Sequence, residues 1–505
     1  MWDATPLLRL YARRRLAQLA HSDPTEAQHR TLTALVRHAA GTRFGREHGF
    51  AALRTVADYQ RAVPLRRYED FWTEYWQAPF PRLVDVTWPG LIPRFAASSG
   101  TTTGVTKQIP VSLAMSRANR HAVFDLLSHH VAHRPESRVL GGKSFMLGGS
   151  SKLKPLAPGV AAGDLSGIAA SEVPWWARGR YFPPPDLARI EDWEEKVARV
   201  AARSLQEDIR TFGGTPSWLL LFVEQLAALR PGAGGRLAGH YPNLELLVHG
   251  GVNFAPYRAR FEALVQGGSA ELREVYPASE GFVAVADRAP GQGLRLLLDN
   301  GLFFEFVPVG ELDRPAPTRH WVGNAEPGVD YALVVTSCAG LWAYILGDTV
   351  RLVDRRPPRV FVTGRTSYGL SAFGEHLIGE EIEEAVAAAA ADVGRLVVDF
   401  TVTPIYPAAE GGPGRHLFLV EFTPPADAEA LRRFSITLDM ALLARNADYA
   451  AHRSGDFGLL APLVEPIPAG GFARWMKARG KLGGQNKVPR VIAEAELLAS
   501  LREQG

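Results

Sequence analysis

The residues best suited to chemistry gather in one short stretch, residues 95–107, which reads FAASSGTTTGVTK. Gly100 and Gly104 give this stretch a backbone that can turn freely and approach a ligand closely. Its hydroxyls and backbone N–H groups can surround an anion, and Lys107 adds a positive charge at the end. We therefore predict that it binds a polyphosphate. The candidate contacts are Ser98, Ser99, Gly100, Thr101, Thr102, Gly104 and Lys107.

The same stretch departs from the loop of P-loop NTPases, G-x-x-x-x-G-K-[ST], because no lysine follows directly on Gly104. An ordinary P-loop NTPase is therefore disfavoured. The remaining alternative is a flexible surface loop rich in Ser, Thr and Gly. The apolar approach at residues 95–97 and the terminal Lys107 favour phosphate binding.

Three further sites combine a glycine with polar groups at the end of an apolar strand. They are residues 276–281 (YPASEG), 344–348 (YILGD) and 364–365 (GR). Open α/β sheets bind ligands at such strand ends. Taken singly, Glu280 reads as a solvated loop carboxylate and Asp348 as a turn residue, so only the combination indicates a site.

Composition limits the classes of protein. The chain has 505 residues, 46% hydrophobic and 22% charged, as in ordinary globular proteins of two or three domains. A net charge of +3 argues against a protein that coats nucleic acid. The single cysteine, Cys338, excludes a disulfide framework and a cysteine-built metal site, and we interpret it as a core residue. We expect a reducing cytoplasm.

The N-terminal segment is basic but lacks the apolar core of a signal peptide. It predicts an amphipathic helix with Leu7, Leu8, Tyr11 and Leu16 facing inward. No apolar run reaches membrane-spanning length, so we expect no membrane partner.

Helical patterns dominate the first half of the chain. Asp23 and Pro24 supply a cap and a first turn between two N-terminal helices. The aromatic residues within 56–80 have helical spacing and are predicted to pack in the core. The predicted helical regions are residues 6–40, 112–131 and, as a cluster with a turn at 213–216, residues 186–230.

Short apolar strands predominate from residue 244 onward, which favours an α/β body with more than one sheet. A helix–strand–strand–helix set after residue 366 is enough for a second domain. We therefore predict an α/β protein with a large mixed N-terminal domain, residues 1–365, and a small α+β C-terminal domain, residues 366–505. Residues 153–185 are expected to be irregular but ordered, with Trp175, Trp176 and Tyr181 buried.

In this order and spacing, the motifs resemble the adenylate-forming enzymes, and most closely the plant auxin-responsive promoter family (Gretchen Hagen family) of acyl acid amido synthetases. The resemblance covers nearly the whole chain. It includes TRFGREHGF near residue 42, VPLRRYEDF near residue 63, GRTSYGLSAFGEHL near residue 364 and GGQNKVPR near the end. It implies a firefly-luciferase-like fold with a mobile C-terminal domain.

The resemblance also implies a reaction. The enzyme would use ATP and Mg²⁺ to activate a small carboxylic acid as an acyl-adenylate, then pass the acyl group to an amine, an amino acid being expected. Lys107 corresponds to a contact with the ATP phosphates. Tyr276, Ser279 and Glu280 match the second motif of the family, where the tyrosine region borders adenine and the carboxylate helps to hold magnesium.

Three residues further along the chain complete the implied site. Asp348 matches the aspartate that binds the ribose hydroxyls, and Arg365 matches the arginine at the junction of the two domains. Lys487 matches the lysine that would reach the carboxylate being activated. The implied catalytic residues are Lys487, Lys107 and Glu280.

The chain departs from the plant pattern in the third motif, where Ala343 and Ile345 replace two arginines. Two alternatives to the amido synthetase stay open: an acyl-CoA ligase with the same adenylation step, and an inactive nucleotide-binding or scaffold protein. The acyl pocket is also open. Trp175, Trp176 and Trp218 lie in regions that could form it, and His249 either borders it or is a hydrogen-bonded core histidine. Nothing in the sequence identifies the acid, the amine or the oligomeric state.

Overall fold

The computed structural model describes residues 2–99, 106–233, 235–251, 254, 257–312, 314–366, 377, 379–405, 414–446, 449–450, 453, 459–482, 487–492 and 494–504. Two compact units are present. Unit 1 comprises residues 1–252 and 260–362, and unit 2 comprises residues 253–259 and 363–505.

Unit 1 begins with a series of helices, and the start of the second follows from local side-chain chemistry. Between the first two helices, the Asp23 carboxylate accepts a hydrogen bond from Glu26 N at 2.9 Å and Pro24 occupies the first turn, as predicted. The helical segments are α1 (Thr5–His21), α2 (Pro24–Ala39), α3 (Arg43–Glu47), η1 (Phe50–Ala52), α4 (Val56–Ala62), α5 (Tyr68–Phe71) and η2 (Trp72–Trp76).

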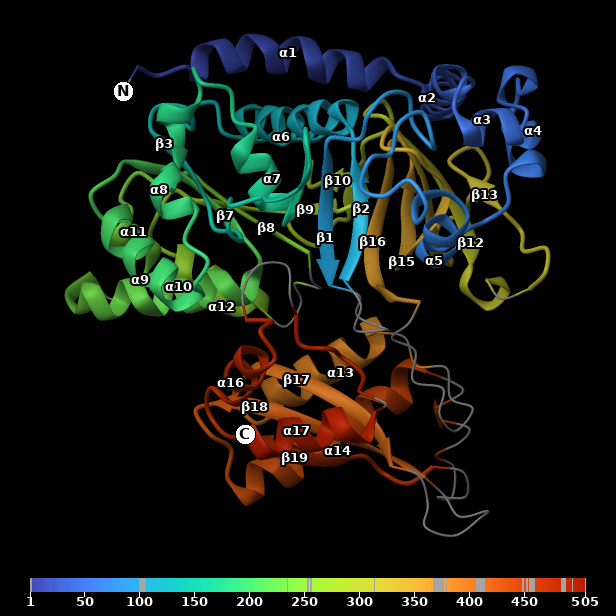
Figure 1. Cartoon of the computed structure of the whole chain (residues 1–505). Helices are drawn as coiled ribbons and strands as arrows, with labels where there is room; N and C mark the ends of the chain where they lie inside the picture. The colour runs from blue at the N-terminus through green and yellow to red at the C-terminus, as the bar shows by residue number, and fades with distance from the viewer. Residues whose placement is uncertain are drawn as a thin grey trace. The chain divides into compact units, whose positions relative to one another are not determined.

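A large sheet forms the centre of unit 1 (Figure 1). Within the described residues, 12 strands pair in the order β13-β12-β14-β15-β16-β11-β10-β9-β8-β7-β3-β6. Strands β9, β8, β7, β3 and β6 run parallel to one another, and β9 is antiparallel to β10. The bounds are β3 (Lys143–Met146), β6 (Tyr181–Phe182), β7 (Ile209–Gly214), β8 (Leu246–Gly250), β9 (Glu271–Ala278), β10 (Gly281–Val285), β11 (Leu294–Leu296), β12 (Leu302–Pro308), β13 (His320–Trp321), β14 (Asp330–Ser337), β15 (Leu341–Arg355) and β16 (Pro358–Arg365).

A second sheet in unit 1 has the order β2-β1-β5-β4. Its strands are β1 (Arg94–Ser99), β2 (Thr106–Val111), β4 (Lys154–Ala157) and β5 (Val160–Gly163). The remaining helical segments of unit 1 are α6 (Leu113–His133), α7 (Leu165–Ser171), η3 (Arg178–Arg180), α8 (Pro185–Ala188), α9 (Trp193–Ser204), α10 (Pro216–Leu229), η4 (Pro231–Ala233), α11 (Leu237–His240), α12 (Arg258–Val265) and η6 (Val309–Glu311). The first residues of α12 fall in the segment 253–259 that belongs to unit 2.

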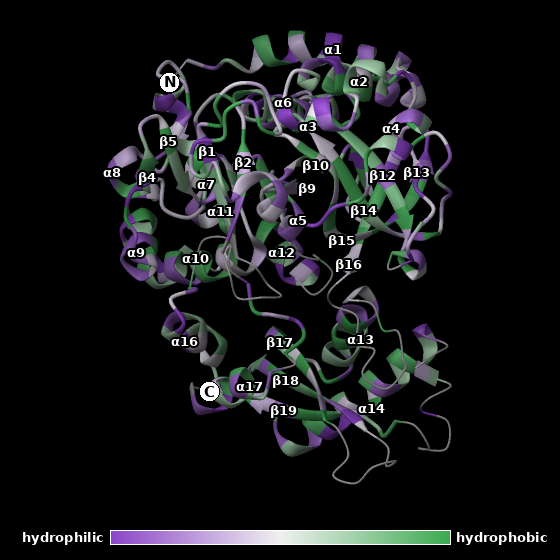
Figure 2. Ribbon diagram, turned by 45° about the vertical axis from the view of Figure 1, so that its right-hand side comes forward, coloured by the Kyte–Doolittle hydropathy of each residue, from purple (hydrophilic) through white to green (hydrophobic). Residues whose placement is uncertain are grey.

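The main core of unit 1 lies between the N-terminal helices and strands β12, β14 and β15. β12 and β14 are predominantly hydrophobic in sequence (Figure 2). The predicted core role of the aromatic residues within 56–80 is confirmed. The buried members are Tyr59, Tyr68, Phe71, Tyr75 and Trp76.

Unit 2 contains a three-stranded sheet, β17-β18-β19, and the helices that cover it. β17 and β18 are antiparallel, and β19 runs parallel to β18. The elements are α13 (Gly379–Asp392), β17 (Leu396–Ile405), β18 (Arg415–Thr423), α14 (Ala428–Arg445), β19 (Leu463–Ile467), α16 (Gly471–Ala478) and α17 (Ala495–Gln504). The mixed α/β class with more than one sheet is confirmed.

Three local predictions were wrong. Residues 209–214 form strand β7 rather than part of a helical cluster, since IRTFGG is a short β-branched and aromatic run between two helices. Residues 153–185 contain strands and helix α7, and Trp175 and Trp176 are 81% and 66% exposed rather than buried. On α1, Leu7 and Tyr11 are exposed, because the helix packs through Thr5, Leu8 and Ala12 instead.

A buried charge cluster lies under α6. The Glu271 carboxylate is 2.6 Å from His130 Nδ1, and it accepts hydrogen bonds from Arg273, including one of 2.8 Å from Nη2. Burial raises the pKa of Glu271, but the hydrogen bonds from His130 and Arg273 outweigh it and lower the pKa to about 2. The ionised carboxylate is therefore part of the folded state.

Candidate active site

The predicted phosphate stretch begins in β1 and ends in β2. The two strands are antiparallel, and their register places Ser98 opposite Lys107 and Ser99 opposite Thr106. Gly100, Thr101, Thr102 and Gly104 lie outside the described residues, and only the backbone of Ser98 and Ser99 is described.

Lys107 lies near the start of β2, where Tyr68 and Glu69 of the aromatic segment 56–80 contact it. Its Nζ lies 3.4 Å from Glu69 Oε1 and 5.2 Å from the centroid of the Tyr68 ring. Tyr68 also accepts a 2.9 Å hydrogen bond from Gln108 N, which fixes the start of β2. Because Glu69 is 55% exposed, its ion pair with Lys107 contributes little, and a polyphosphate of higher charge could replace it.

Ser279 and Glu280 form the two-residue turn between β9 and β10, where Ala278 pairs with Gly281. Gly281 has φ +152°, and a Cβ at this position would lie 2.7 Å from Leu302 Cδ2. The turn therefore requires glycine here. It presents Glu280 half-buried, beside the buried Ser279.

A hydrogen bond joins the second motif to the third. The Tyr276 hydroxyl donates to Asp348 Oδ2 at 2.5 Å, and the Tyr276 side chain is buried. Asp348 lies on β15 where the pairing with β14 shifts by two residues, next to Gly347 at φ +88°. The bulge aims the carboxylate away from the regular ladder. A carboxylate has several acceptor positions, so this hydrogen bond is compatible with others from a diol.

The third motif is also supported by the segment VPLRRYEDF. Arg66 N donates to Ala343 O at 3.1 Å, and Ile345 N donates to Arg66 O at 2.9 Å. Ala343 has φ +45°, which is rare for a residue with a side chain. Thr336 Oγ1 stabilises this conformation by accepting a 2.9 Å hydrogen bond from Ala343 N.

The Arg66 side chain joins the two N-terminal segments that resemble the family. Its guanidinium lies over the rings of Phe44 and Tyr75, at 5.2 and 5.7 Å from their centroids. Its Nη2 lies 3.2 Å from Glu74 Oε2 and 3.3 Å from His48 Nε2. Burial lowers the pKa of His48, which favours the neutral ring that can accept this hydrogen bond.

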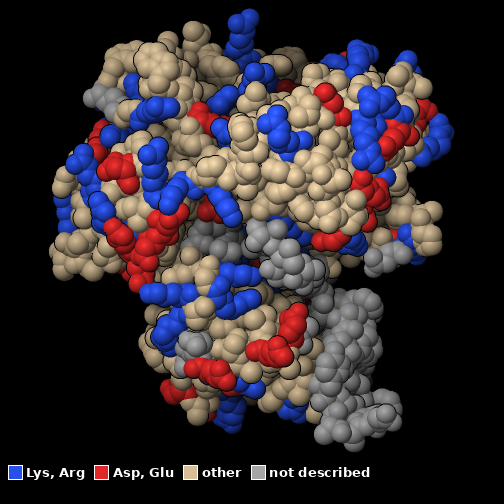
Figure 3. All heavy atoms as spheres, viewed as in Figure 1, with Lys and Arg blue, Asp and Glu red and all other residues tan. Residues whose placement is uncertain are grey.

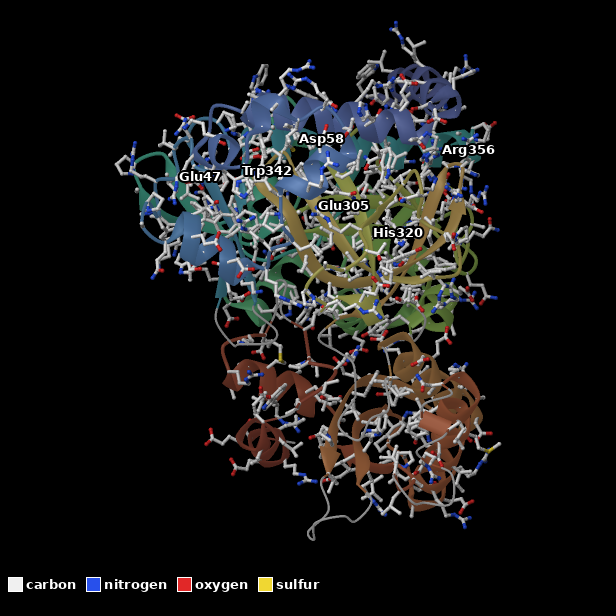
Figure 4. The ribbon with its side chains drawn as sticks, turned by 90° about the vertical axis from the view of Figure 1, so that its right-hand side faces the viewer. Glu47, Asp58, Glu305, His320, Trp342 and Arg356 are labelled. Atoms are coloured by element: carbon white, nitrogen blue, oxygen red, sulfur yellow. The ribbon has the colours of Figure 1, made fainter. Side chains whose placement is uncertain are left out.

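Trp342, on β15, also links the third motif to the N-terminal part of the chain. Its Nε1 donates to Thr87 O at 2.9 Å, and its ring lies 4.7 Å from that of Phe50. Figure 4 shows Trp342 beside the N-terminal segment that carries Glu47. We assigned no role to Arg66 or Trp342 from the sequence, and the available signal was their position inside or beside segments that resemble the family.

Two of the other predicted residues belong to unit 2. Arg365 ends β16, and the exposed Lys487 lies between α16 and α17. Trp218 is buried against Trp193, with ring centroids 4.7 Å apart, whereas Trp175 and Trp176 are exposed.

Cys338 is buried, which confirms its core assignment, and burial raises its pKa to about 12. A thiol of this kind is a poor nucleophile at neutral pH. His249 is also buried, on β8.

No group of three or more His, Cys, Asp or Glu side chains comes together as a metal site in the part of the chain that the structure describes. A single carboxylate such as Glu280 suits Mg²⁺ when phosphates supply further oxygens. None of the described helices is both long and apolar enough to cross a bilayer.

Three family models match the chain. They are the GH3 family N-terminal domain over residues 13–169, the central domain over residues 295–365 and the C-terminal domain over residues 380–496.

Curated relatives come from plants. A probable indole-3-acetic acid-amido synthetase GH3.2 of Oryza sativa subsp. japonica is 23% identical over 94% of this chain and 90% of its own length. Other matches cover only part of the chain. Indole-3-acetic acid-amido synthetase GH3.3 of Arabidopsis thaliana is 24% identical over 46% of this chain and 41% of its own length. For a second local match, GH3.9 of Oryza sativa subsp. japonica, the matched part is 55% of the relative.

Solved structures share the fold. The AtGH3.15 acyl acid amido synthetase in complex with 2,4-DB has a TM-score of 0.82 at 18% identity, covering 100% of this chain and 97% of that one. A 2-hydroxyisobutyryl-CoA ligase in complex with 2-HIB-AMP has a TM-score of 0.61 at 16% identity, covering 95% of this chain and 91% of that one. The fold is thus that of adenylate-forming enzymes, and with all three domain models in order along the sequence, the chain belongs to the GH3 family.

Proposed function

We propose that the chain is an ATP-dependent acyl acid amido synthetase, which activates a small carboxylic acid and transfers the acyl group to an amine, an amino acid being expected. The observation that carries this proposal is the hydrogen bond between Tyr276 and Asp348. It joins the two motifs that the family uses for the nucleotide, in a chain that retains Lys107, Glu280 and Lys487.

Activation is needed because a carboxylate is a poor acyl donor. One carboxylate oxygen attacks the α-phosphorus of ATP, the bond from that phosphorus to the bridging oxygen breaks, and pyrophosphate leaves. The product, an acyl-adenylate, has AMP as a good leaving group. Negative charge gathers on the phosphates as this happens, so cations that converge there stabilise the transition state.

The proposed roles follow from position and charge. Asp348 accepts hydrogen bonds from the ribose hydroxyls, with one of its oxygens oriented by Tyr276. Lys107, near the start of β2, binds the phosphates, which replace Glu69 as its ion-pair partner. Glu280, in the β9–β10 turn, helps to hold Mg²⁺, which would neutralise part of the phosphate charge when bound.

The cationic residues of unit 2 serve the first step in this proposal. Lys487 pairs with the attacking carboxylate and Arg365 marks the segment about which unit 2 would move. In the second step the amine nitrogen attacks the acyl carbonyl, the C–O bond to AMP breaks, and the nitrogen loses a proton. That step needs access for the amine, which a single arrangement of the units would serve poorly.

An acyl-CoA ligase is the second candidate, since a CoA ligase shares the fold. One experiment separates the candidates. A panel of carboxylic acids is incubated with ATP and Mg²⁺, then with amino acids or with CoA, and AMP and acyl products are measured by mass spectrometry. The proposal predicts an acyl-amide and AMP only when an amine is supplied. A thioester with CoA would support the rival, and no product with any pair would favour a scaffold.

Glu280→Gln and Glu26→Gln form a matched pair for this assay, since both change one carboxylate of unit 1 to an amide. Glu26 is 65% exposed in a surface pair with Arg30, so its variant should keep wild-type product formation. Loss confined to the Glu280 variant supports the site.

A further inference from the structure

Helix α1 packs against α6 and leaves its opposite face exposed (Figure 1). We define the α1–α6 face by Leu7, Leu10, Tyr11, Arg13 and Arg14 of α1 and Phe124 of α6. It lies outside all the motifs that carry the proposed function, and it does not depend on that function.

Apolar side chains are concentrated on this face. Leu7, Leu10 and Tyr11 are 60%, 69% and 41% exposed, and their spacing places them on one stripe of α1. The Tyr11 ring lies 5.7 Å from that of Phe124, itself 40% exposed, so the stripe continues onto α6. Four of the 17 exposed large hydrophobic side chains in the described part of the chain therefore lie together on this face.

Apart from the contact of Tyr11 with Phe124, α1 is held by contacts on its other side. The helix is anchored through its other side, where Leu8 and Ala12 are buried and Arg9 Nη2 donates to Ser137 O at 2.5 Å. Arg15 makes two hydrogen bonds to Asp125, of 2.8 and 2.7 Å, and two to Asp299. The exposed stripe is therefore available to another surface without loss of the contacts that fix the helix.

The charge of the face is of one sign. Residues 5–21 contain four arginines and no acid, and residues 113–133 contain Arg117 and Arg120 and a single acid, Asp125, which is buried against Arg15. Arg13 and Arg14 are exposed beside the apolar stripe. Figure 2 shows polar and apolar residues interleaved along α1, and Figure 3 shows basic side chains at the edge of unit 1 where α1 lies.

We propose that the α1–α6 face docks on an anionic lipid surface. Exposed leucine and aromatic side chains flanked by arginines are the chemistry that binds the boundary between headgroups and acyl chains. A second copy of the chain is disfavoured, because pairing this face with itself would bring arginines of the same sign together. The expectation of no membrane partner depended on the lack of a spanning segment, and surface docking requires none.

The test is flotation of the full chain with vesicles of phosphatidylcholine alone or mixed with phosphatidylserine. Leu7→Gln/Leu10→Gln removes apolar contact and Arg13→Gln/Arg14→Gln removes charge. The matched controls are Ile436→Gln/Met440→Gln, two exposed apolar positions on α14, and Arg199→Gln/Arg203→Gln, two exposed arginines on α9. Circular dichroism verifies that each variant is folded.

We expect binding to mixed vesicles and little to phosphatidylcholine alone, with weakening at high salt. Each arginine near an anionic surface contributes about fivefold in affinity, so the Arg13/Arg14 variant should bind about 25-fold more weakly. The apolar variant should also lose binding, and both controls should retain it. Failure to float with mixed vesicles at low salt, or equal binding of all variants, overturns the proposal. A dimer in sedimentation velocity that only the apolar variant abolishes would assign the face to a second copy instead.

Discussion

Tyr276→Phe isolates the contact on which the nucleotide site depends. It removes only the hydroxyl that donates to Asp348 Oδ2 at 2.5 Å, and it keeps the buried ring. A hydrogen bond to a charged group contributes about 1.5–3 kcal/mol, which sets an upper limit of roughly ten- to 150-fold on the loss. Because Asp348 keeps its charge, we expect KM for ATP to rise by about tenfold, with kcat changed less.

The assay is initial rate against ATP concentration at saturating acid. The control is Tyr241→Phe, which removes a buried hydroxyl 2.6 Å from Ser204 Oγ, away from the motifs. Both variants should lose about 0.5–3 kcal/mol of unfolding free energy, but only Tyr276→Phe should change KM for ATP. A KM within twofold of wild type for Tyr276→Phe would refute the proposed orientation of Asp348.

Four further outcomes are expected. Lys107→Ala should lower kcat/KM for ATP by about ten- to a hundredfold with unchanged melting temperature, since one charge-assisted contact contributes about 1.5–3 kcal/mol. Wild-type kinetics with ATP would show that Lys107 does not bind the phosphates. Arg66→Met should lower the free energy of unfolding by about 2–3 kcal/mol in chemical denaturation, because it removes the hydrogen bonds of the buried Arg66 with His48 and Glu74 next to the third motif; an unchanged midpoint would show that these contacts do not stabilise unit 1. For Glu271, the lowered pKa means that its stabilising effect is present above the unfolded pKa and is lost as pH falls from about 4.5 toward 2, so Glu271→Gln should flatten the melting temperature across that window; parallel curves for both proteins would contradict this. Lys487→Ala should reduce adenylate formation by about two orders of magnitude but leave amide formation from supplied acyl-adenylate largely intact, and equal losses in both half-reactions would show that the lysine is not specific to the first.

Much of the fold was predictable because local chemistry determines it. Asp23 and Ser112 cap the helices that they precede by accepting hydrogen bonds from Glu26 N and Met115 N, and no tertiary context was needed to expect either helix. The turn at Ser279 and Glu280 follows in the same way from the glycine that stands between two strand-like runs.

The missed features depend on contacts between distant segments. The contact of Tyr276 with Asp348 spans 72 residues, and it depends on a bulge in β15 that no local pattern specifies. The backbone hydrogen bonds between Arg66 and β15 likewise join residues that are about 280 positions apart in the sequence. On α1, the apolar pattern correctly predicts a helix, but the side on which Leu7 and Tyr11 lie depends on how α6 packs, which the pattern does not contain.

The activation step tests the proposed function most directly. Labelled pyrophosphate is incubated with ATP, Mg²⁺ and each acid, without any amine, and label entering ATP is counted. The proposed function predicts exchange that requires one of the acids, needs no amine, and falls sharply in the Lys107 and Lys487 variants. Exchange without acid, or no exchange with any acid by a folded protein that binds ATP, would contradict it.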